Sequence, residues 1–581
     1  MFIINIISIF IVLIFSRLTL ILIHMNIQAA QLKGVYDQFA EVRKVIAAIK
    51  SNTSSFKLQD HPEIVDARPG YKMVNGILTD EKAIVFLVDK KIDPELLERP
   101  SIPKTIDGIV TDVDNVSPFE FVRKSAFETM ALSLPGLALQ GNKYLVDSAE
   151  FEAIASLQPV IGYVKPANVH LDAVEEEMTV ICHVSPEQGW KQLKQFLTGV
   201  TDELRVGMYD FSTTGIRDAL KAIAADHKKI SLVYDGKSAA GVGSGNKKDD
   251  VLEDAIIDAI SVAADSGKFE HVKAKLGRNG LFANAYHIKV AVKDQKAFWL
   301  SSGNWQSSNQ PDLSNAGSFA DILHDYNREW HIIVMNAKLA TIYYEFLKYD
   351  ADCSKVTTGG LEFMALDFMQ MPDILLPINQ MARTNNARPF DAKIFEFKSG
   401  KKLKIQPLLT PDNYINQVLP LIKKAQHKLY FQNQYITIKD NLTPEYQELL
   451  NALLAKSKDA AIDFRVILRN EGDVRLMVEN LKAFGFDQAK IRIQDNCHNK
   501  GILIDDAITV IGSHNYSNSG VQFNRDASLI IYHPDITAYY QQVFLFDWER
   551  LGSPRIPSVR VAAADETAAG SVKRNWESLY D

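Results

Sequence analysis

The chain contains two copies of one eight-residue pattern, HIKVAVKD at residues 287–294 and HNKGILID at residues 498–505. In each copy a histidine comes first, a lysine follows two positions later and an aspartate closes the pattern. Even if His, Lys and Asp were scattered freely, only on the order of a tenth of one match is expected in a chain of this length. The repeat therefore indicates a shared architecture and a shared chemical role.

The residues that follow each copy repeat as well. A serine lies fifteen positions after each histidine, and an asparagine lies seventeen positions after it. An acid then closes each set, in the triplets Asn327-Arg328-Glu329 and Asn524-Arg525-Asp526. The candidate site residues are His287, Lys289, Asp294, Ser302, Asn304 and Glu329 in the first copy and His498, Lys500, Asp505, Ser513, Asn515 and Asp526 in the second.

These residue types suit chemistry at phosphorus. A phosphodiester carries its negative charge on non-bridging oxygens, and its displacement depends on cationic and amide donors around them. The lysines and asparagines of both sets are such donors. A neutral imidazole can attack phosphorus, and a second imidazole, held as imidazolium, can protonate the leaving oxygen. The two motifs supply one histidine for each role.

Both motifs and their extensions resemble the phospholipase D superfamily, and the resemblance covers roughly residues 185 to 550. It implies two HxKxxxxD halves that face each other across one active site. It also implies that His287 is the nucleophile and His498 the general acid and then base, although the sequence alone leaves this order open. The remaining motif residues are expected to be catalytic, and Ser302 and Ser513 are expected to bind substrate.

The two copies differ in two places. Ser301 stands where the second copy has Gly512, and Asp526 is one methylene shorter than Glu329. Asp294 and Asp505 each end an apolar stretch, so a structural role in the following turn competes with a chemical one.

The sequence predicts an α/β protein with two pseudo-twofold related phospholipase D-like α/β/α sandwich domains, preceded by a small α+β domain. From residue 185 strands and helices alternate twice, which is typical of sheets flanked by helices. Residues 185–188 (SPEQ) and 410–413 (TPDN) are each predicted to be a helix-capping box with proline at the first helical position. The predicted segments are 1–24 (apolar), 25–184 (α+β domain), 185–350 (first domain), 351–403 (linker), 404–552 (second domain) and 553–581 (tail).

Residues 2–23 are nearly continuous Ile, Leu, Phe and Val, long enough at ~1.5 Å per residue to cross a bilayer as a helix. No Lys or Arg precedes this run, and Arg17 lies inside it. An upstream start-site artefact, a membrane anchor and a cleaved signal all remain open. The expected localisation is accordingly cytoplasmic or membrane-associated, with membrane contact through residues 2–23 if they are retained.

The formal net charge of −7 argues against broad coating of nucleic acid, which needs a basic face. A phospholipid or another small phosphodiester is therefore the favoured substrate, with nucleic acid as the alternative and a non-catalytic scaffold as a third hypothesis. Three widely spaced cysteines favour a reducing compartment. No cofactor or metal is expected, and the glycine-rich loop 236–245 lacks the register of a nucleotide-binding motif and is interpreted as a surface insertion or lid.

Overall fold

The computed structural model describes residues 38–88, 102–116, 161–236, 249–277, 280–315, 322–323, 325–355, 390–438, 442–470 and 474–557. The predictions for the apolar run 2–23, for most of the glycine-rich loop and for nearly all of the tail lie outside these residues.

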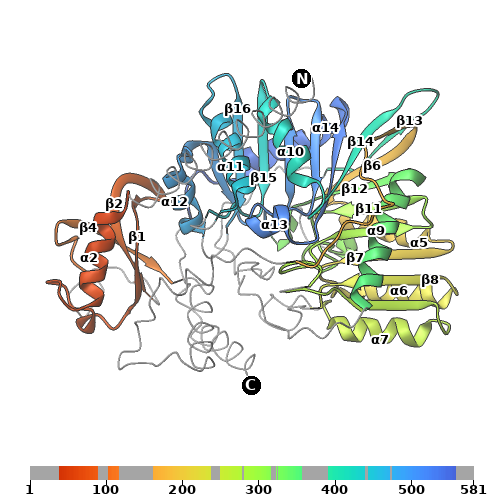
Figure 1. Cartoon of the computed structure of the whole chain (residues 1–581), viewed down its shortest axis with the longest axis horizontal. Coiled ribbons are helices and arrows are strands. Elements are labelled where there is room, and N and C mark those ends of the chain that lie inside the picture. The colour runs from red at the N-terminus through yellow and green to blue at the C-terminus, as the bar shows by residue number, and fades with distance from the viewer. Residues whose placement is uncertain are drawn as a thin grey trace, which may run out of the picture.

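Two mixed sheets of eight strands form the body of the protein (Figure 1). The first sheet contains, in spatial order, β13 (Lys393–Phe397), β6 (Met178–Ser185), β12 (Glu329–Met335), β11 (Ala297–Ser301), β10 (Lys289–Lys293), β7 (Glu203–Met208), β8 (Lys229–Tyr234) and β9 (Phe269–Lys273). The second contains β17 (Ile491–Gln494), β16 (Asp463–Arg469), β15 (Lys428–Asn433), β18 (Lys500–Ile504), β19 (Ile508–Gly512), β20 (Ala527–Tyr532), β14 (Leu403–Leu409) and β5 (Val174–Glu176). Read in opposite directions, the two strand orders correspond, which is the structural form of the sequence repeat.

The motif strands lie inside these sheets. β10 pairs with β7 and β11, and β18 pairs with β15 and β19, all in antiparallel register. The apolar residues between each motif lysine and aspartate are buried, as a strand covered on both faces requires. β7, β8 and β9, like β15, β16 and β17, pair in parallel, which the helices between them allow.

Each half lends one edge strand to the sheet of the other. β5 precedes β6 in the chain but pairs with β14 in the second sheet, whereas β13 precedes β14 but pairs with β6 in the first sheet. The predicted boundaries therefore need correction: a first domain that starts at 185 leaves out all but the last residue of β6, and the predicted linker 351–403 contains β13. These edge strands are short and carry no motif, so their exchange leaves no periodicity in the sequence.

The helices divide into outer and inner sets. The outer helices are α5 (Gly189–Thr198), α6 (Thr214–Ala225) and α7 (Glu253–Ala263) on the first sheet and α10 (Tyr414–Lys424), α11 (Pro444–Lys458) and α12 (Val474–Phe484) on the second. The inner helices α9 (Ala337–Lys355) and α14 (Pro534–Phe546) share one apolar core with both sheets. Their tyrosines cross the interface: Tyr343 donates to the carbonyl of Ser528 at 2.9 Å, and Tyr540 donates to that of His331 at 2.6 Å.

The two predicted capping boxes are wrong. α5 begins at Gly189 and α10 at Tyr414, later than the prolines at 186 and 411. The Ser185–Pro186 and Thr410–Pro411 peptide bonds are cis, and residues 186–188 and 410–413 form turns before the helices. Within these segments, Glu187 and Asp412 bind buried arginines.

A small module precedes the two halves. α2 (Ala40–Lys50) packs on a four-stranded sheet of β1 (Ile64–Val74), β2 (Ile77–Val88), β4 (Ile109–Asn115) and β3 (Thr105–Ile106), in that order. Its apolar residues form one continuous core with those of α12 and neighbouring parts of the second half. Figure 1 accordingly places this module beside α12.

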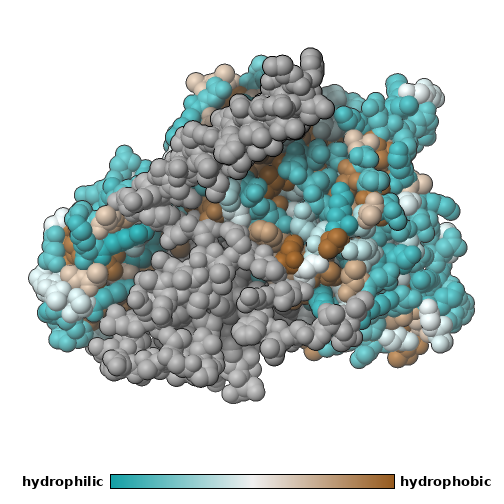
Figure 2. All heavy atoms as spheres, in the orientation of Figure 1, coloured by the Kyte–Doolittle hydropathy of each residue, from teal (hydrophilic) through white to brown (hydrophobic). Residues whose placement is uncertain are grey.

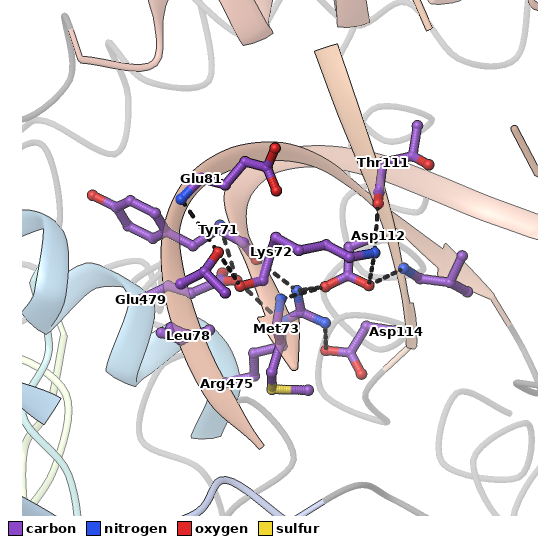
Figure 3. A network of polar contacts seen from close by, with 12 residues as sticks. Tyr71, Lys72, Met73, Leu78, Glu81, Thr111, Asp112, Asp114, Arg475 and Glu479 are labelled. Atoms are coloured by element: carbon purple, nitrogen blue, oxygen red, sulfur yellow. Dashed lines mark hydrogen bonds and ion pairs between the residues drawn. The ribbon is translucent and has the colours of Figure 1, made fainter. Parts of the chain in front are cut away.

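A buried polar network fixes the module on α12 (Figure 3). Arg475 forms ion pairs with Asp112 at 2.9 Å and with Glu479 at 3.0 Å, and donates to the carbonyl of Tyr71 at 3.0 Å. Glu479 in turn forms an ion pair with Arg68 of β1. Burial by itself raises the pKa of Asp112, but the Arg475 guanidinium and backbone amides outweigh it and hold that pKa below its usual range. Two of these ion pairs, Arg475–Asp112 and Arg68–Glu479, join the module to α12.

The visible described surface is mostly hydrophilic, with small apolar patches (Figure 2). The large apolar side chains that are exposed among the described residues are Val74, Ile77, Val164, Leu252, Val262, Met335 and Ile394. Among the helices that the structure describes, none combines the length and apolarity needed to span a membrane.

Arg475→Ala is expected to destabilise the protein by about 3 to 5 kcal/mol, because it leaves the Asp112 and Glu479 carboxylates buried without their shared cation. Urea unfolding measures the loss. Lys482→Ala is the matched control on the same helix, since Lys482 pairs with the exposed Asp80 and should cost far less. Equal losses in the two variants would contradict the assigned role of Arg475.

Candidate active site

The two motif histidines occupy equivalent positions in the two halves, just before a central strand of each sheet. His287 and His498 each lie two residues before the lysine that begins its motif strand, β10 or β18. Both rings are buried, with relative exposures of 4% for His287 and 0% for His498. Both motif lysines are buried as well. Buried cations and imidazoles at the same place in two repeats require partners, and the structure supplies them.

Each histidine binds the acid of the other half. His287 Nδ1 lies 2.7 Å from Asp526 Oδ1, and His498 Nδ1 is in hydrogen-bond contact with Glu329 Oε1. Glu329 begins β12 and Asp526 immediately precedes β20, so both acids are held by strands. The shorter Asp526 therefore reaches a histidine as Glu329 does.

Backbone hydrogen bonds between the two halves stabilise these crossed histidine–acid contacts. His498 donates its amide to the carbonyl of Arg328 at 3.1 Å, and Arg328 donates to that of Asn496 at 2.8 Å. In the equivalent place, Arg525 donates to the carbonyl of Ala285 at 3.1 Å. The residues next to each acid thus pair with the residues next to the opposite histidine.

Ser302 and Ser513 orient the acids. Ser302 Oγ donates to Glu329 Oε2 at 2.5 Å, and Ser513 Oγ donates to Asp526 Oδ1 at 2.7 Å. Each hydroxyl also accepts the amide of the residue after its acid, Trp330 or Ala527. The sequence predicted that these serines bind substrate, but their contacts in the structure are with the carboxylates.

The two motif lysines place positive charge beside the histidines. Lys289 Nζ donates to the carbonyl of His287 and Lys500 Nζ to that of His498, both at 2.8 Å. Lys500 Nζ also lies 3.1 Å from His498 Nε2, while Lys289 Nζ lies 4.9 Å from the centre of the Tyr209 ring. Two ammonium groups in one buried site suit a ligand with concentrated negative charge.

The motif asparagines lie in the same region of each half. Asn304 and Asn515 are both buried, each on the segment that follows a central strand, β11 or β19. Asn304 Nδ2 lies within 3.3 Å of Gln306 Oε1. Their side-chain amides are candidate donors to a bound ligand.

Asp294 and Asp505 lie at the opposite end of the motif strands. Asp294 accepts backbone amides from residues 201–203, which lead into β7, and Asp505 accepts those of residues 426–428, which lead into β15. These hydrogen bonds outweigh burial and lower the pKa of both carboxyls. Both aspartates adopt positive φ, 52° and 50°, which short polar side chains tolerate at a turn. Of the two roles left open by the sequence, these contacts favour the structural one.

The surroundings of His287 lower its pKa and so favour the neutral imidazole. Burial is the main cause that lowers the pKa of His287 to about 4, and the Lys289 charge adds to it against the opposing effect of Asp526. For the two acids, the charged neighbours outweigh burial. Burial alone raises the pKa of Glu329 and of Asp526, but the paired histidine and nearby lysines hold both pKa values below their usual range.

Two buried arginines were not predicted as site residues. Arg328 pairs with Glu187 and Asp547, and Arg525 pairs with Asp350 and Asp412. Each arginine immediately precedes a site acid, Glu329 or Asp526, and forms ion pairs with one carboxylate from each half. These ion pairs fix the site acid at the interface between the halves. The sequence signal for these arginines is the repeated Asn-Arg-acid triplet, in which each of them stands in the middle.

In the described part of the chain, no group of three or more His, Cys, Asp and Glu side chains converges in a way that could hold a metal ion. The predicted lid, the glycine-rich loop 236–245, lies outside the described part except for Gly236.

Comparisons with known proteins agree with the resemblance seen in the sequence. A family model described as cardiolipin synthase, PLD-like domain, matches residues 418–548, which carry the second motif. This region is therefore a phospholipase D-like domain. No curated protein matches the chain.

Solved structures similar to this chain include a phosphatidylserine synthase from Haemophilus influenzae Rd KW20, at 12% identity and a TM-score of 0.42, over 69% of this chain and 93% of that one. NucT from Helicobacter pylori is 16% identical with a TM-score of 0.22, over 31% of this chain and 98% of that one. A phospholipase D family member, Nuc from Salmonella typhimurium, is 18% identical with a TM-score of 0.21, over 26% and 95%.

Asp294→Ala and Asp526→Asn should have opposite effects. Asp294→Ala removes the acceptor for three backbone amides and should cost about 1 to 3 kcal/mol of stability, with turnover of the folded protein within a few-fold of wild type. Asp526→Asn should leave stability closer to wild type but lower turnover by about two orders of magnitude or more, because the His287 tautomer is no longer fixed. Thermal unfolding and steady-state kinetics measure both. Loss of turnover in Asp294→Ala as deep as in Asp526→Asn would contradict the structural role of Asp294.

Proposed function

We propose that this protein is a phospholipase D-like enzyme that breaks a phosphodiester through a covalent phosphohistidine. The observation that supports this most is the reciprocal histidine–carboxylate pairing, in which both Nδ1 atoms are engaged. Nε2 is therefore the reacting nitrogen of each ring. One site with two such nitrogens offers a nucleophile and a proton donor at once.

The reaction proceeds in two displacements. In the first, the lone pair on His287 Nε2 forms a bond to phosphorus while the bond to the leaving oxygen breaks, and that oxygen takes the proton from His498 Nε2. In the second, His498 Nε2 takes a proton from the incoming water or alcohol, whose oxygen bonds to phosphorus and releases His287. No external cofactor enters either step.

The assignment of His287 as nucleophile follows the family resemblance and agrees with its surroundings. A pKa lowered to about 4 keeps the His287 imidazole neutral at physiological pH, as attack on phosphorus requires. Lys289, Lys500, Asn304 and Asn515 are proposed to bind the non-bridging oxygens. Asp526 and Glu329 hold the tautomers of the two rings, and Ser302 and Ser513 hold those acids.

A phospholipid is the proposed substrate. The family model that matches residues 418–548 is named for cardiolipin synthase, an enzyme of phospholipid synthesis by its name. That name suggests a second reaction beside the hydrolysis predicted from the sequence, namely transfer of the phosphoryl group to an alcohol. A phosphohistidine can pass its phosphoryl group to either acceptor, so one site can support both reactions.

His287→Ala and His498→Ala should each reduce turnover to below about a tenth of wild type while the fold is retained, because each removes a chemical participant. Hydrolysis of bis(p-nitrophenyl) phosphate measures turnover, and circular dichroism checks the fold. Brief reaction of His498→Asn with ³²P-labelled substrate should leave label on a peptide that contains His287. Label on His498 in the reciprocal His287→Asn experiment would reverse the two roles.

A lipid-cleaving enzyme should form phosphatidylethanol as well as phosphatidic acid when a few per cent ethanol is added to phosphatidylcholine, because ethanol competes with water for the phosphohistidine. Thin-layer chromatography separates the products, and a gel of single-stranded DNA is run beside it. Intact DNA with phosphatidylethanol is the expected result. Degraded DNA with untouched lipid would assign the same residues to a nuclease.

A further inference from the structure

The two histidine–carboxylate pairs differ in how many donors their acid receives. The Glu329 carboxylate accepts His498 Nδ1 and Asn309 Nδ2 at Oε1 and Ser302 Oγ at Oε2. Asp526 accepts both His287 Nδ1 and Ser513 Oγ at Oδ1, and its Oδ2 has no hydrogen-bond partner among the described residues. Asn309 is thus an additional donor that only one pair possesses.

The amide of Asn309 is held in one orientation. The residue is fully buried and lies five positions after Asn304. Ser308 Oγ donates to Asn309 Oδ1 at 2.8 Å, so the oxygen is occupied and Nδ2 faces Glu329. The same Nδ2 lies 3.3 Å from His498 Nδ1. An N–H donor therefore faces both members of this pair.

The second half cannot reproduce this contact. Gly520 lies five positions after Asn515, the place that corresponds to Asn309. A Cβ at Gly520 would lie 2.2 Å from the backbone carbonyl oxygen of Asn515, a distance that requires the backbone to move. The inequality of the two pairs is therefore built into the packing of both halves.

We propose that Asn309 is a positioning residue that acts through Glu329 and makes the His498 imidazolium release its proton more readily. The proposal rests on the proposed phosphodiesterase function of this site. A hydrogen bond donated to a carboxylate stabilises its charge and weakens its attraction for a neighbouring imidazolium. Asn309 thereby makes protonated His498 a stronger acid, which favours transfer of its proton to the leaving oxygen.

The sign of the effect follows from the groups that face His498. Glu329 from β12 favours the imidazolium, and Lys500 from β18 disfavours it. Asn309, from the segment after β11, weakens the Glu329 attraction and also points a donor at Nδ1. Loss of the Asn309 amide should therefore raise the pKa of His498 and leave that of His287 unchanged.

Two variants separate this role from simple packing. Asn309→Ala removes the donor, and Asn309→Asp keeps the side-chain size but replaces the donor with a carboxylate. The His498 titration is followed by NMR with ¹³C-labelled histidine rings, and His498→Gln identifies its signal. The pKa of His498 should rise by roughly one unit in Asn309→Ala and further in Asn309→Asp. The alkaline limb of the kcat/KM profile should move upward in the same order.

Asn336→Ala is the matched control, because it removes a buried amide that binds Glu176, at the other end of β12 from Glu329. It should lower stability without moving the His498 titration. Unchanged His498 titration in both Asn309 variants, or an equal shift at His287, would overturn the proposal. The NMR measurement needs no turnover, so failure of the proposed reaction would appear separately, as absence of phosphodiester cleavage by the wild-type protein.

Discussion

The exchange of acids between the two halves is the constraint on which the site depends. Each motif histidine is oriented by a carboxylate that the other half provides, His287 by Asp526 and His498 by Glu329. Neither half contains a complete pair. Because a buried imidazole without its carboxylate is free to adopt the wrong tautomer, a single half has no defined reacting nitrogen. Both halves are therefore needed to complete the two histidine–carboxylate pairs.

The same reciprocity recurs through the interface. Inner-helix tyrosines bond to strands of the opposite half, edge strands β5 and β13 join the opposite sheet, and each buried arginine binds an acid from both halves. These contacts fix the distance between the two acids and the two histidines. A displacement reaction, however, needs unlike groups, a nucleophile and an acid. The frame is symmetric, and the inequality comes from single positions such as Asn309 and Gly520.

The sequence predicted the residues that repeat in the two halves but not the contacts that join one half to the other. The motif spacing identified both histidines, both lysines and both acids, and the alternation of strands and helices predicted an α/β fold around them. The partner of each acid was not predictable, because the contact joins residues 239 positions apart for His287 and 169 for His498. The Ser185 and Thr410 segments were misread because a capping box and a turn that binds arginine share the same residue types. Asn309 left no signal because it has no counterpart in the repeat.

The most direct test of the crossed pairing is proton NMR of the histidine Nδ1–H groups, whose resonances shift far downfield when they donate to a carboxylate. The account predicts that Asp526→Asn removes the downfield signal of His287 and retains that of His498, while Glu329→Gln does the reverse. A His287 signal that persists in Asp526→Asn and disappears in Glu329→Gln would show that each acid serves its own half, and would contradict the account.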